Sequence, residues 1–350
     1  MLKRIMIAVV ILILIVPFLL FIVGAFISAP SFKGSSSDHF DGKKFFNPHG
    51  QEQHGMGAVF KWMWEPKQPS YVTEKTPSYG KHPLGSEKEN IRITFINHST
   101  FLIQVDGINI LTDPIWSERA SPFTWAGPKR VKFPGIKMED LPPIHAVVIS
   151  HNHYDHLDIS TMRTIFGAHH PKIVTPLGVK SYFDNEQIVG VTDVDWWDEV
   201  SISDSVRVQA VPAQHFSGRG VTDRDATLWA GYVIKTSKGN IYFAGDTGYN
   251  EKTFKEIGEK AGPMAVSLLP IGAYLPRWFM SPIHTSPEEA VKIHLDVRSG
   301  NSIGMHFGTF PLADEEQGQS QRDLKAALTK YHIHEETFVT LREGDLKIIE

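Results

Sequence analysis

The segment from Ser150 to Asp158 constrains this chain more than any other part of its sequence. It reads Ser-His-Asn-His-Tyr-Asp-His-Leu-Asp and follows the apolar run Ala146–Ser150, which is typical of a buried strand. Four side chains that can bind a metal therefore lie within six residues. A chance match of this kind is expected in about two chains in a thousand of this composition. A solvated histidine loop would not explain why polar residues follow a buried strand so abruptly, so we predict a metal site.

The spacing within this segment favours two cations over one. In an extended loop, His151 and His153 project to the same side and can meet one cation. Asp155 and His156 follow at the turn and can reach a second cation nearby. Cysteine is absent and 17 histidines are present, so any metal or acid–base site must be built from imidazole and carboxylate.

Three further candidate ligands each follow a predicted strand. His215 comes after a strand that ends at Val211, Asp246 after an apolar run that ends at Ala244, and His306 directly after Met305. Taken singly, these residues could be a surface loop residue, the start of a turn and a core histidine. Together with the Ser150–Asp158 segment they indicate one site that is assembled from several strand ends.

The predicted elements of the body are short and alternate in type, which favours an α/β or layered α+β fold. The expected strands are Ile91–Phe95, Phe101–Val105, Ile108–Leu111, Ala146–Ser150, Ile173–Thr175, Val206–Val211, Leu228–Thr236, Asn240–Ala244 and Ser302–Met305. A hairpin turn is expected at Asp106-Gly107. One helix is expected from Asp158 to Phe166, and a second from Ser286, with a capping box and a first-turn proline, to Val297.

The amino-terminal segment predicts a membrane anchor. Ile5–Ile27 is a run of 23 residues without a charge, preceded by Lys3 and Arg4. A helix of that length would span roughly 34 Å, enough for a hydrocarbon core of ~30 Å. A cleaved signal peptide is the alternative, but its apolar region is normally shorter. The positive-inside rule then places the body outside the cytoplasm, in the periplasm if the source is a Gram-negative bacterium. We therefore expect an anchor at 1–30, a flexible tether at 31–57 and a hydrolase domain at 58–350.

Beyond these patterns, the sequence resembles the metallo-β-lactamase superfamily through His151-Asn-His-Tyr-Asp-His156, His215, Gly245-Asp246 and His306, in the order that superfamily shows. It is similar, more closely still, to the family of N-acyl-phosphatidylethanolamine-hydrolysing phospholipases D. The segments that carry this second resemblance are Leu111–Ile115, Gly127–Arg130, Leu141–Pro143, Pro270–Tyr274, Pro276–Met280, Pro287–Ala290 and His306–Phe310.

The resemblance implies a four-layer αββα sandwich with two Zn²⁺ ions along one edge. It assigns His151, His153 and His215 to one zinc. It assigns Asp155, His156 and His306 to the other, with Asp246 as the bridging ligand. Iron or manganese could replace zinc, because imidazole and carboxylate sites accept several of these ions.

The same resemblance implies a phosphodiesterase that converts N-acyl-phosphatidylethanolamine into N-acylethanolamine and phosphatidic acid. Two metal ions can lower the pKa of a bridging water and stabilise the charge that develops on a phosphodiester. The expected reaction is in-line attack of the bridging hydroxide on phosphorus. Asp246 would orient this hydroxide and pass a proton to the leaving oxygen, and Asp155 is the second carboxylate expected to take part in catalysis.

Several other residues are candidates for supporting roles, each with a structural alternative. Asp113 could hold a metal-bound histidine, or it could only form an Asp-Pro turn. His98 could line the site or lie in a hairpin loop, and His284 could face the substrate or solvent. Tyr274 and Arg277 belong to an aromatic, cationic loop that could contact the head group or could be core.

The expected partners are a phospholipid substrate and a membrane, with a homodimer as an open expectation. Nucleic-acid binding is disfavoured, because the formal net charge is -4 and no run of Lys or Arg is longer than two residues. Two alternatives remain open. A related metallo-hydrolase could act on a lactone or a soluble phosphodiester, and a non-catalytic metal-binding scaffold could keep the fold without turnover.

Overall fold

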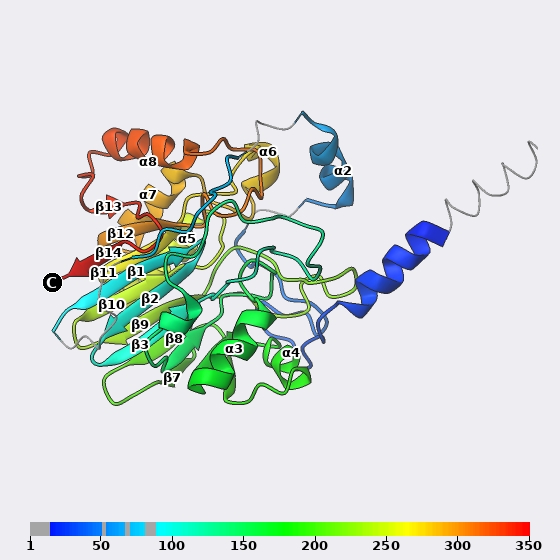
Figure 1. The fold of residues 1–350 in the computed structure, drawn as a ribbon, viewed down its shortest axis with the longest axis horizontal. Coiled ribbons are helices and arrows are strands. Elements are labelled where there is room, and N and C mark those ends of the chain that lie inside the picture. The colour runs from blue at the N-terminus through cyan, green and yellow to red at the C-terminus, as the bar shows by residue number, and fades with distance from the viewer. Residues whose placement is uncertain (1–14, 51–53, 67–70, 81–88) are drawn as a thin grey trace, which may run out of the picture.

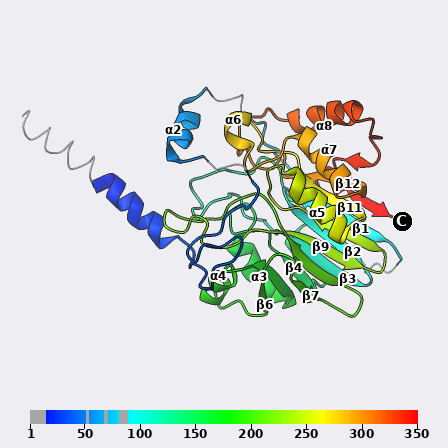
Figure 2. The ribbon, with the colours of Figure 1, turned by 180° about the vertical axis from the view of Figure 1, so that it is seen from behind.

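Two seven-stranded β-sheets stack face to face in the computed structural model, which describes residues 15–50, 54–66, 71–80 and 89–350 (Figures 1 and 2). The first sheet has the order β14 (Leu346–Ile349), β1 (Ile91–Asn97), β2 (Thr100–Val105), β3 (Ile108–Thr112), β4 (Ala146–Val148), β5 (Lys172–Pro176) and β6 (Val191–Val194). The second has the order β13 (Phe338–Val339), β12 (Ser299–Met305), β11 (Met264–Pro270), β10 (Gly239–Phe243), β9 (Gly231–Thr236), β8 (Arg207–Val211) and β7 (Glu199–Ser201).

The main core lies between the sheets, and helices cover both outer faces. Phe95 and Phe101 from the first sheet belong to the same buried cluster as Tyr232 and Tyr242 from the second. The first sheet is covered by α3 (Ile159–His169) and α4 (Lys180–Asn185), and the second by α5 (Glu251–Ala261), α7 (Pro287–Asp296) and α8 (Gln319–Lys330) (Figure 1). The layered α/β sandwich with two sheets is therefore confirmed.

Local sequence signals explain where these elements begin. The Asp158 carboxylate caps α3 by accepting hydrogen bonds from the backbone amides of Ser160 and Thr161. Helix α7 begins with the predicted capping box between Ser286 and Glu289, with proline in its first turn. The remaining short helices are α2 (Met56–Trp64), α6 (Arg277–Met280) and the 3₁₀ helix Met138–Asp140.

Strand direction brings many strand ends to one edge of the sandwich. Strands β3 to β6 run parallel to one another, and so do β10 to β13. Strand β8 points the same way as β10, because both pair antiparallel with β9 between them. The carboxyl ends of β3, β4, β8, β10 and β12 consequently meet at one edge, and the loops after them carry the candidate ligands.

The amino-terminal prediction is corrected by the structure. The described part of the apolar run is a helix over residues 15–26, about 18 Å long at 1.5 Å per residue, and residues 5–14 lie outside the described part. Its end joins the body, where the Ala29 amide donates to the Asp223 carboxylate at 2.8 Å. Nowhere in the described ranges is there an apolar helix of membrane-spanning length. This finding contradicts the predicted single-pass anchor and the extracytoplasmic location inferred from it, because the helical part of the run that the structure describes, residues 15–26, is too short to cross a hydrocarbon core of ~30 Å.

Part of the segment expected as a tether packs on the body, although most of its described residues between 31 and 50 are exposed. Phe40 and Phe45 are 1% and 2% exposed and share a buried cluster with Leu228 and Trp229. The Phe45 amide donates to the Asp225 carbonyl at 2.8 Å. Aromatic residues within the polar stretch, rather than its glycines and serines, decide how this segment behaves.

Candidate metal centre

The seven predicted ligands come together at the shared edge of the two sheets. His151, His153, Asp155 and His156 lie in the loop after β4, and the other three follow β8, β10 and β12. Their nearest ligand atoms fall into sets that lie within 4.8 Å of one another. Two of these sets organise the site. We call His151, His153 and His215 the histidine group, and His98, Asp155, His156 and His306 the mixed group.

The histidine group has three imidazole nitrogens that point into one small space. His153 Nδ1 lies 2.8 Å from His151 Nε2 and 3.3 Å from His215 Nε2. Ligands of a tetrahedral ion at ~2.1 Å are roughly 3.4 Å apart, so this spacing suits one cation. His215 Nδ1 donates to the Ile283 carbonyl at 2.8 Å, which leaves its Nε2 available as an acceptor.

The mixed group surrounds the carboxylate of Asp155. Asp155 Oδ2 lies 3.1 Å from His98 Nε2, 3.3 Å from His306 Nε2 and 3.5 Å from His156 Nε2. His98 therefore faces the cluster rather than solvent, and it is only 1% exposed. The sequence offered two alternatives for His98, a place in the site or a place in a hairpin loop. His98 lies in the turn between β1 and β2, and its side chain also points into the site.

Asp246 lies between the two groups. Its Oδ2 is 3.1 Å from His306 Nε2 and 3.2 Å from His156 Nε2 in the mixed group, and 3.7 Å from His215 Nε2 in the histidine group. Gly245 precedes it with φ +60°, and a Cβ there would lie 2.6 Å from Ser150 Cβ. A glycine is required because the turn after β10 passes so close to the loop after β4.

Asp113, at the end of β3, holds one candidate ligand from behind. Its Oδ2 accepts hydrogen bonds from His156 Nδ1 and Ser150 Oγ, both at 2.6 Å, and its Oδ1 accepts from the Ser150 amide at 2.7 Å. Asp113 and His156 are both fully buried. The carboxylate holds the proton on His156 Nδ1, which leaves Nε2 as the nitrogen that faces the site.

The charges of the cluster favour a bound cation. Burial lowers the pKa of His156, but the carboxylates of Asp246, Asp155 and Asp113 outweigh it and raise that pKa well above its usual value. The same balance between burial and the nearby carboxylates raises the pKa of His306 to about 9. In the histidine group, burial lowers every pKa, to about 4 for His153, so these imidazoles stay neutral as ligation requires.

Unsatisfied atoms support the same interpretation. His156 Nε2 and Asp246 Oδ1 are buried without a hydrogen-bond partner among the described residues. Such atoms are costly unless something pairs with them. The donor set of imidazoles and carboxylates, with its spacing and its negative potential, fits divalent metal ions.

A cavity of about 320 Å³ opens onto the cluster. Ligand candidates line one end of it: His153, Asp155, Asp246 and His306. The other walls are mostly apolar and include Trp62 from α2 and Phe279 from α6, whose rings stack at 5.3 Å. His284 also lines this cavity, with its Nδ1 3.8 Å from Asp246 Oδ2, and burial lowers its pKa to about 4.

Two of the candidate substrate residues lie outside this cavity. Arg277 donates to both carboxylate oxygens of Glu289, at 2.9 and 2.7 Å, and to the His284 carbonyl at 2.9 Å. The Tyr274 hydroxyl donates to Asp323 Oδ2. Both side chains line a separate cavity instead. Their polar groups are used within the protein, and Arg277 supports the loop that carries His284.

Sequence reasoning missed the wall that α2 contributes to the cavity. The apolar residues Val59, Trp62 and Met63 follow the spacing of a helix face, and that pattern is the signal that could have found it. Phe216 and Arg224, which also line the cavity, carry no such signal. They follow His215 in a loop without a regular pattern.

Comparisons with known proteins identify the family and the fold. Residues 108–307 match the family model described as a beta-lactamase superfamily domain. Igni18, a metallo hydrolase from Ignicoccus hospitalis, has the same fold, with a TM-score of 0.56 and 22% identity over 75% of this chain and 99% of that one. Fold and site together define a metal-dependent hydrolase.

Relatives in sequence identify the family. An N-acyl-phosphatidylethanolamine-hydrolyzing phospholipase D 1 from Caenorhabditis elegans is 39% identical over 265 residues, which are 72% of this chain and 74% of that protein. The mitochondrial enzyme of that name from Saccharomyces cerevisiae is 34% identical over 228 residues, 63% of this chain and 48% of that protein. The chain belongs to the N-acyl-phosphatidylethanolamine-hydrolysing phospholipase D family within the metallo-β-lactamase superfamily.

Proposed function

We propose that this protein is a zinc-dependent phosphodiesterase of the phospholipase D type. It hydrolyses N-acyl-phosphatidylethanolamine to N-acylethanolamine and phosphatidic acid. The observation that carries this proposal is that Asp246 lies between two ligand groups at the end of an apolar cavity. The names of two relatives, both N-acyl-phosphatidylethanolamine-hydrolyzing phospholipases D, support the choice of substrate.

The histidine group would hold one Zn²⁺, and Asp155, His156 and His306 would hold a second, with Asp246 near both groups. His98 would lie within reach of the second ion as well. When bound, such a pair supplies Lewis acidity, which polarises a phosphodiester and lowers the pKa of water. Imidazole and carboxylate ligands favour zinc but also accept iron or manganese.

The chain's own groups then orient water and move protons. Asp246 Oδ1 is the buried acceptor that can hold the attacking water and receive its proton. His284, which is neutral because burial lowers its pKa to about 4, lines the cavity beside Asp246, with its Nδ1 3.8 Å from Asp246 Oδ2, and can hydrogen-bond the substrate. Apolar residues such as Leu312 and Ile283 exclude bulk water around these groups.

The cavity also limits what can bind. Its volume of about 320 Å³ lies at the lower end of small-ligand sites, ~300 to 1,000 Å³. We propose that the phosphodiester and its immediate neighbours fill it, while the acyl chains extend along the apolar side chains of α2 and α6. The Arg224 guanidinium, 4.4 Å above the Phe216 ring, places a positive charge in the wall near the anionic phosphate.

A lipid panel tests this proposal. The metal-reconstituted protein is incubated with N-acyl-phosphatidylethanolamine, unacylated phosphatidylethanolamine, a lactone and a soluble phosphodiester, and the products are identified by mass spectrometry. Release of N-acylethanolamine with phosphatidic acid is expected. Preferred turnover of the lactone or the soluble diester would support the alternative hydrolase, and no turnover of any substrate would support the scaffold.

Asp246→Asn provides the matched variant. It keeps the size of the side chain but loses its charge and its ability to take up a proton. We expect a folded protein with hydrolysis reduced at least 1,000-fold, the order that loss of a general base combined with a bridging ligand implies. Turnover within tenfold of the parent would exclude the role proposed for Asp246.

A further inference from the structure

Arg219 is a nearly buried arginine that contacts the metal-binding loop from behind. It lies four residues after His215, in the loop that follows β8, and is 6% exposed. Its Nη1 donates to the Asn152 carbonyl at 2.8 Å and to the Leu157 carbonyl at 3.0 Å. These two carbonyls stand on either side of the segment His153–His156. One guanidinium nitrogen thus joins the two ends of that segment through two hydrogen bonds.

Neighbouring contacts fix the guanidinium in place. Its carbon lies 3.9 Å from the centre of the Tyr154 ring and 4.6 Å from that of Tyr182, in α4. Cation–π contacts of this kind are worth ~0.5 to 2 kcal/mol, more where water is excluded. A second link runs parallel to the first, because the Gly218 amide donates to Asn152 Oδ1 at 2.8 Å.

These contacts join two loops that supply ligands to the same ion. The loop after β4 carries His151 and His153, and the loop after β8 carries His215. The His215–Arg219 stretch therefore reaches the first loop twice, through an imidazole at the site and through a guanidinium behind it. Holding a ligand loop in its binding geometry is the general effect of groups that contact ligands from outside the site.

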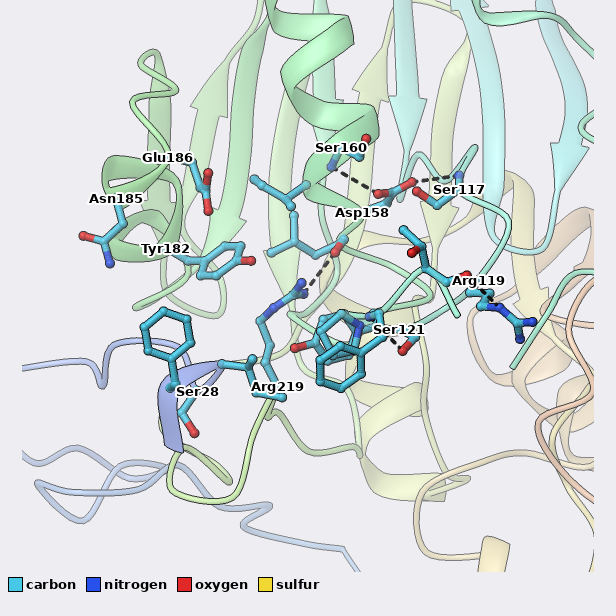
Figure 3. Close-up of a pocket in the computed structure, with 18 of the residues that line it drawn as sticks. Ser28, Ser117, Arg119, Ser121, Asp158, Ser160, Tyr182, Asn185, Glu186 and Arg219 are labelled. Atoms are coloured by element: carbon cyan, nitrogen blue, oxygen red, sulfur yellow. Dashed lines mark hydrogen bonds between the residues drawn. The ribbon is translucent and has the colours of Figure 1, made fainter. Parts of the chain in front are cut away.

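Arg219 does not face the substrate side. It lines a cavity of about 690 Å³ together with Tyr154, Leu157 and Tyr182 (Figure 3). Among the described residues, this cavity shares no lining residue with the one that opens onto the metal cluster. Arg219 can act on the chemistry only through the segment that it holds.

We propose that Arg219 is a positioning residue for the metal centre. It keeps His153, Asp155 and His156 at the separations that two ions require. This inference rests on the metal centre of the proposed function, but not on the identity of its substrate. Replacement of Arg219 will weaken metal binding, and it will lower kcat for a phosphodiester more than it raises KM.

Arg219→Met tests this proposal, with Arg130→Met as the matched control. Arg130 is also 6% exposed and also donates to backbone carbonyls, those of Ser117, Lys132 and Ile115, and none of these hydrogen bonds reaches the segment 152–157. Both variants remove an arginine that stabilises loops, so both are expected to lower Tm. Only Arg219→Met should change the metal centre.

The main readout is metal binding alone. The apo proteins are titrated with Zn²⁺ in competition with a chelator, and the visible spectrum of the Co²⁺ forms reports ligand geometry. We expect about 10- to 100-fold weaker Zn²⁺ binding for Arg219→Met, an altered Co²⁺ spectrum, and less than a twofold change for Arg130→Met. Arg219→Lys should recover part of the affinity, because an ammonium keeps the charge and can still donate to a carbonyl.

The outcomes separate this inference from the proposed function. Equal Zn²⁺ affinities for Arg219→Met and Arg130→Met would overturn the positioning role, even if the parent hydrolyses phosphodiesters. Selective loss of affinity in a parent that hydrolyses no phosphodiester would support the positioning role and refute the substrate. If Arg219→Met does not fold, Tyr182→Leu removes one stacking partner and should weaken Zn²⁺ binding about two- to fivefold, and unchanged affinity would overturn the proposal.

Discussion

Asp113→Asn is the substitution for which the structure gives the sharpest expectation. The Asp113 carboxylate accepts three hydrogen bonds, of which two converge on Oδ2 from His156 Nδ1 and Ser150 Oγ. Asparagine keeps a carbonyl acceptor for the Ser150 amide. The NH₂ group of asparagine would face His156 Nδ1 and Ser150 Oγ, so these two groups lose their acceptor. His156 must then carry its proton on Nε2, the nitrogen that faces Asp155 and Asp246.

The size of the effect follows from this change of tautomer. Loss of a hydrogen-bond partner behind a metal ligand reduces metal affinity 10- to 100-fold, or by about 1.4 to 2.7 kcal/mol. We expect the upper end of this range, because the substitution both removes an acceptor and blocks the ligating nitrogen. Fold stability should also fall, by roughly 1.5 to 3 kcal/mol, the contribution of a hydrogen bond to a charged group.

Asp193→Asn is the control for this measurement. Asp193 also accepts three hydrogen bonds, from the Thr175 hydroxyl and from the amides of Gly178 and Lys180, but it lies on β6 away from the cluster. Zn²⁺ affinity is measured by chelator competition, and unfolding is followed by circular dichroism. Both variants should lose stability, and only Asp113→Asn should lose affinity. The reasoning fails if Asp113→Asn binds Zn²⁺ as tightly as the parent, or if Asp193→Asn loses as much affinity.

Three further perturbations address metal, backbone and pH. If the free metal concentration is 1,000 times the Kd, removal of the metal should lower the free energy of unfolding by about 4 kcal/mol and Tm by roughly 6 °C. An unchanged Tm in calorimetry would contradict a bound cation. Gly245→Ala should destabilise the protein more than Gly308→Ala. Both positions have positive φ, but only a Cβ at residue 245 would clash, with Ser150. Equal losses in the free energy of unfolding in urea would contradict this expectation. Burial lowers the pKa of His39, but the carboxylates of Asp195 and Asp38 outweigh burial and raise that pKa on folding. The protonated His39 therefore stabilises the fold fully below pH ~6.5, and this stabilisation is lost as the pH rises through the raised pKa. His39→Gln should flatten that dependence of Tm on pH, and an equally steep profile would exclude His39 as its source.

The candidate site was largely predictable because metal ligation leaves a dense local signal. A solvated histidine loop, the structural alternative, does not explain four ligand candidates in six residues directly after a buried strand. The single residues after β8, β10 and β12 became predictable only in combination, since parallel strands bring their carboxyl ends to one edge. Arg219 was not predictable, because its partners are backbone carbonyls, which any sequence supplies.

The fold was predictable where local chemistry sets the boundary and not where tertiary packing does. Helices α3 and α7 begin at the residues that their capping signals indicate. The 31–57 segment shows the opposite case. Its glycines and serines predict a loose chain, yet Phe40 and Phe45 find a buried cluster built from the 213–229 region. No local sequence pattern predicts a packing partner that lies more than 150 residues away in the chain.

Backbone strain shows why the rest of the site required a structure. His98, Asp113 and His306 all adopt positive φ, at 47°, 34° and 60°, although none is glycine. Residues held in this way cost of order 1 to 3 kcal/mol each and persist only where their surroundings fix them. The surroundings here are specific. The His98 amide donates to the Thr309 hydroxyl, and its carbonyl accepts from the His306 amide at 2.8 Å, so two strained residues hold each other. A sequence shows which side chains can bind a metal. The hydrogen bonds that hold these side chains toward the site are seen only in the folded chain.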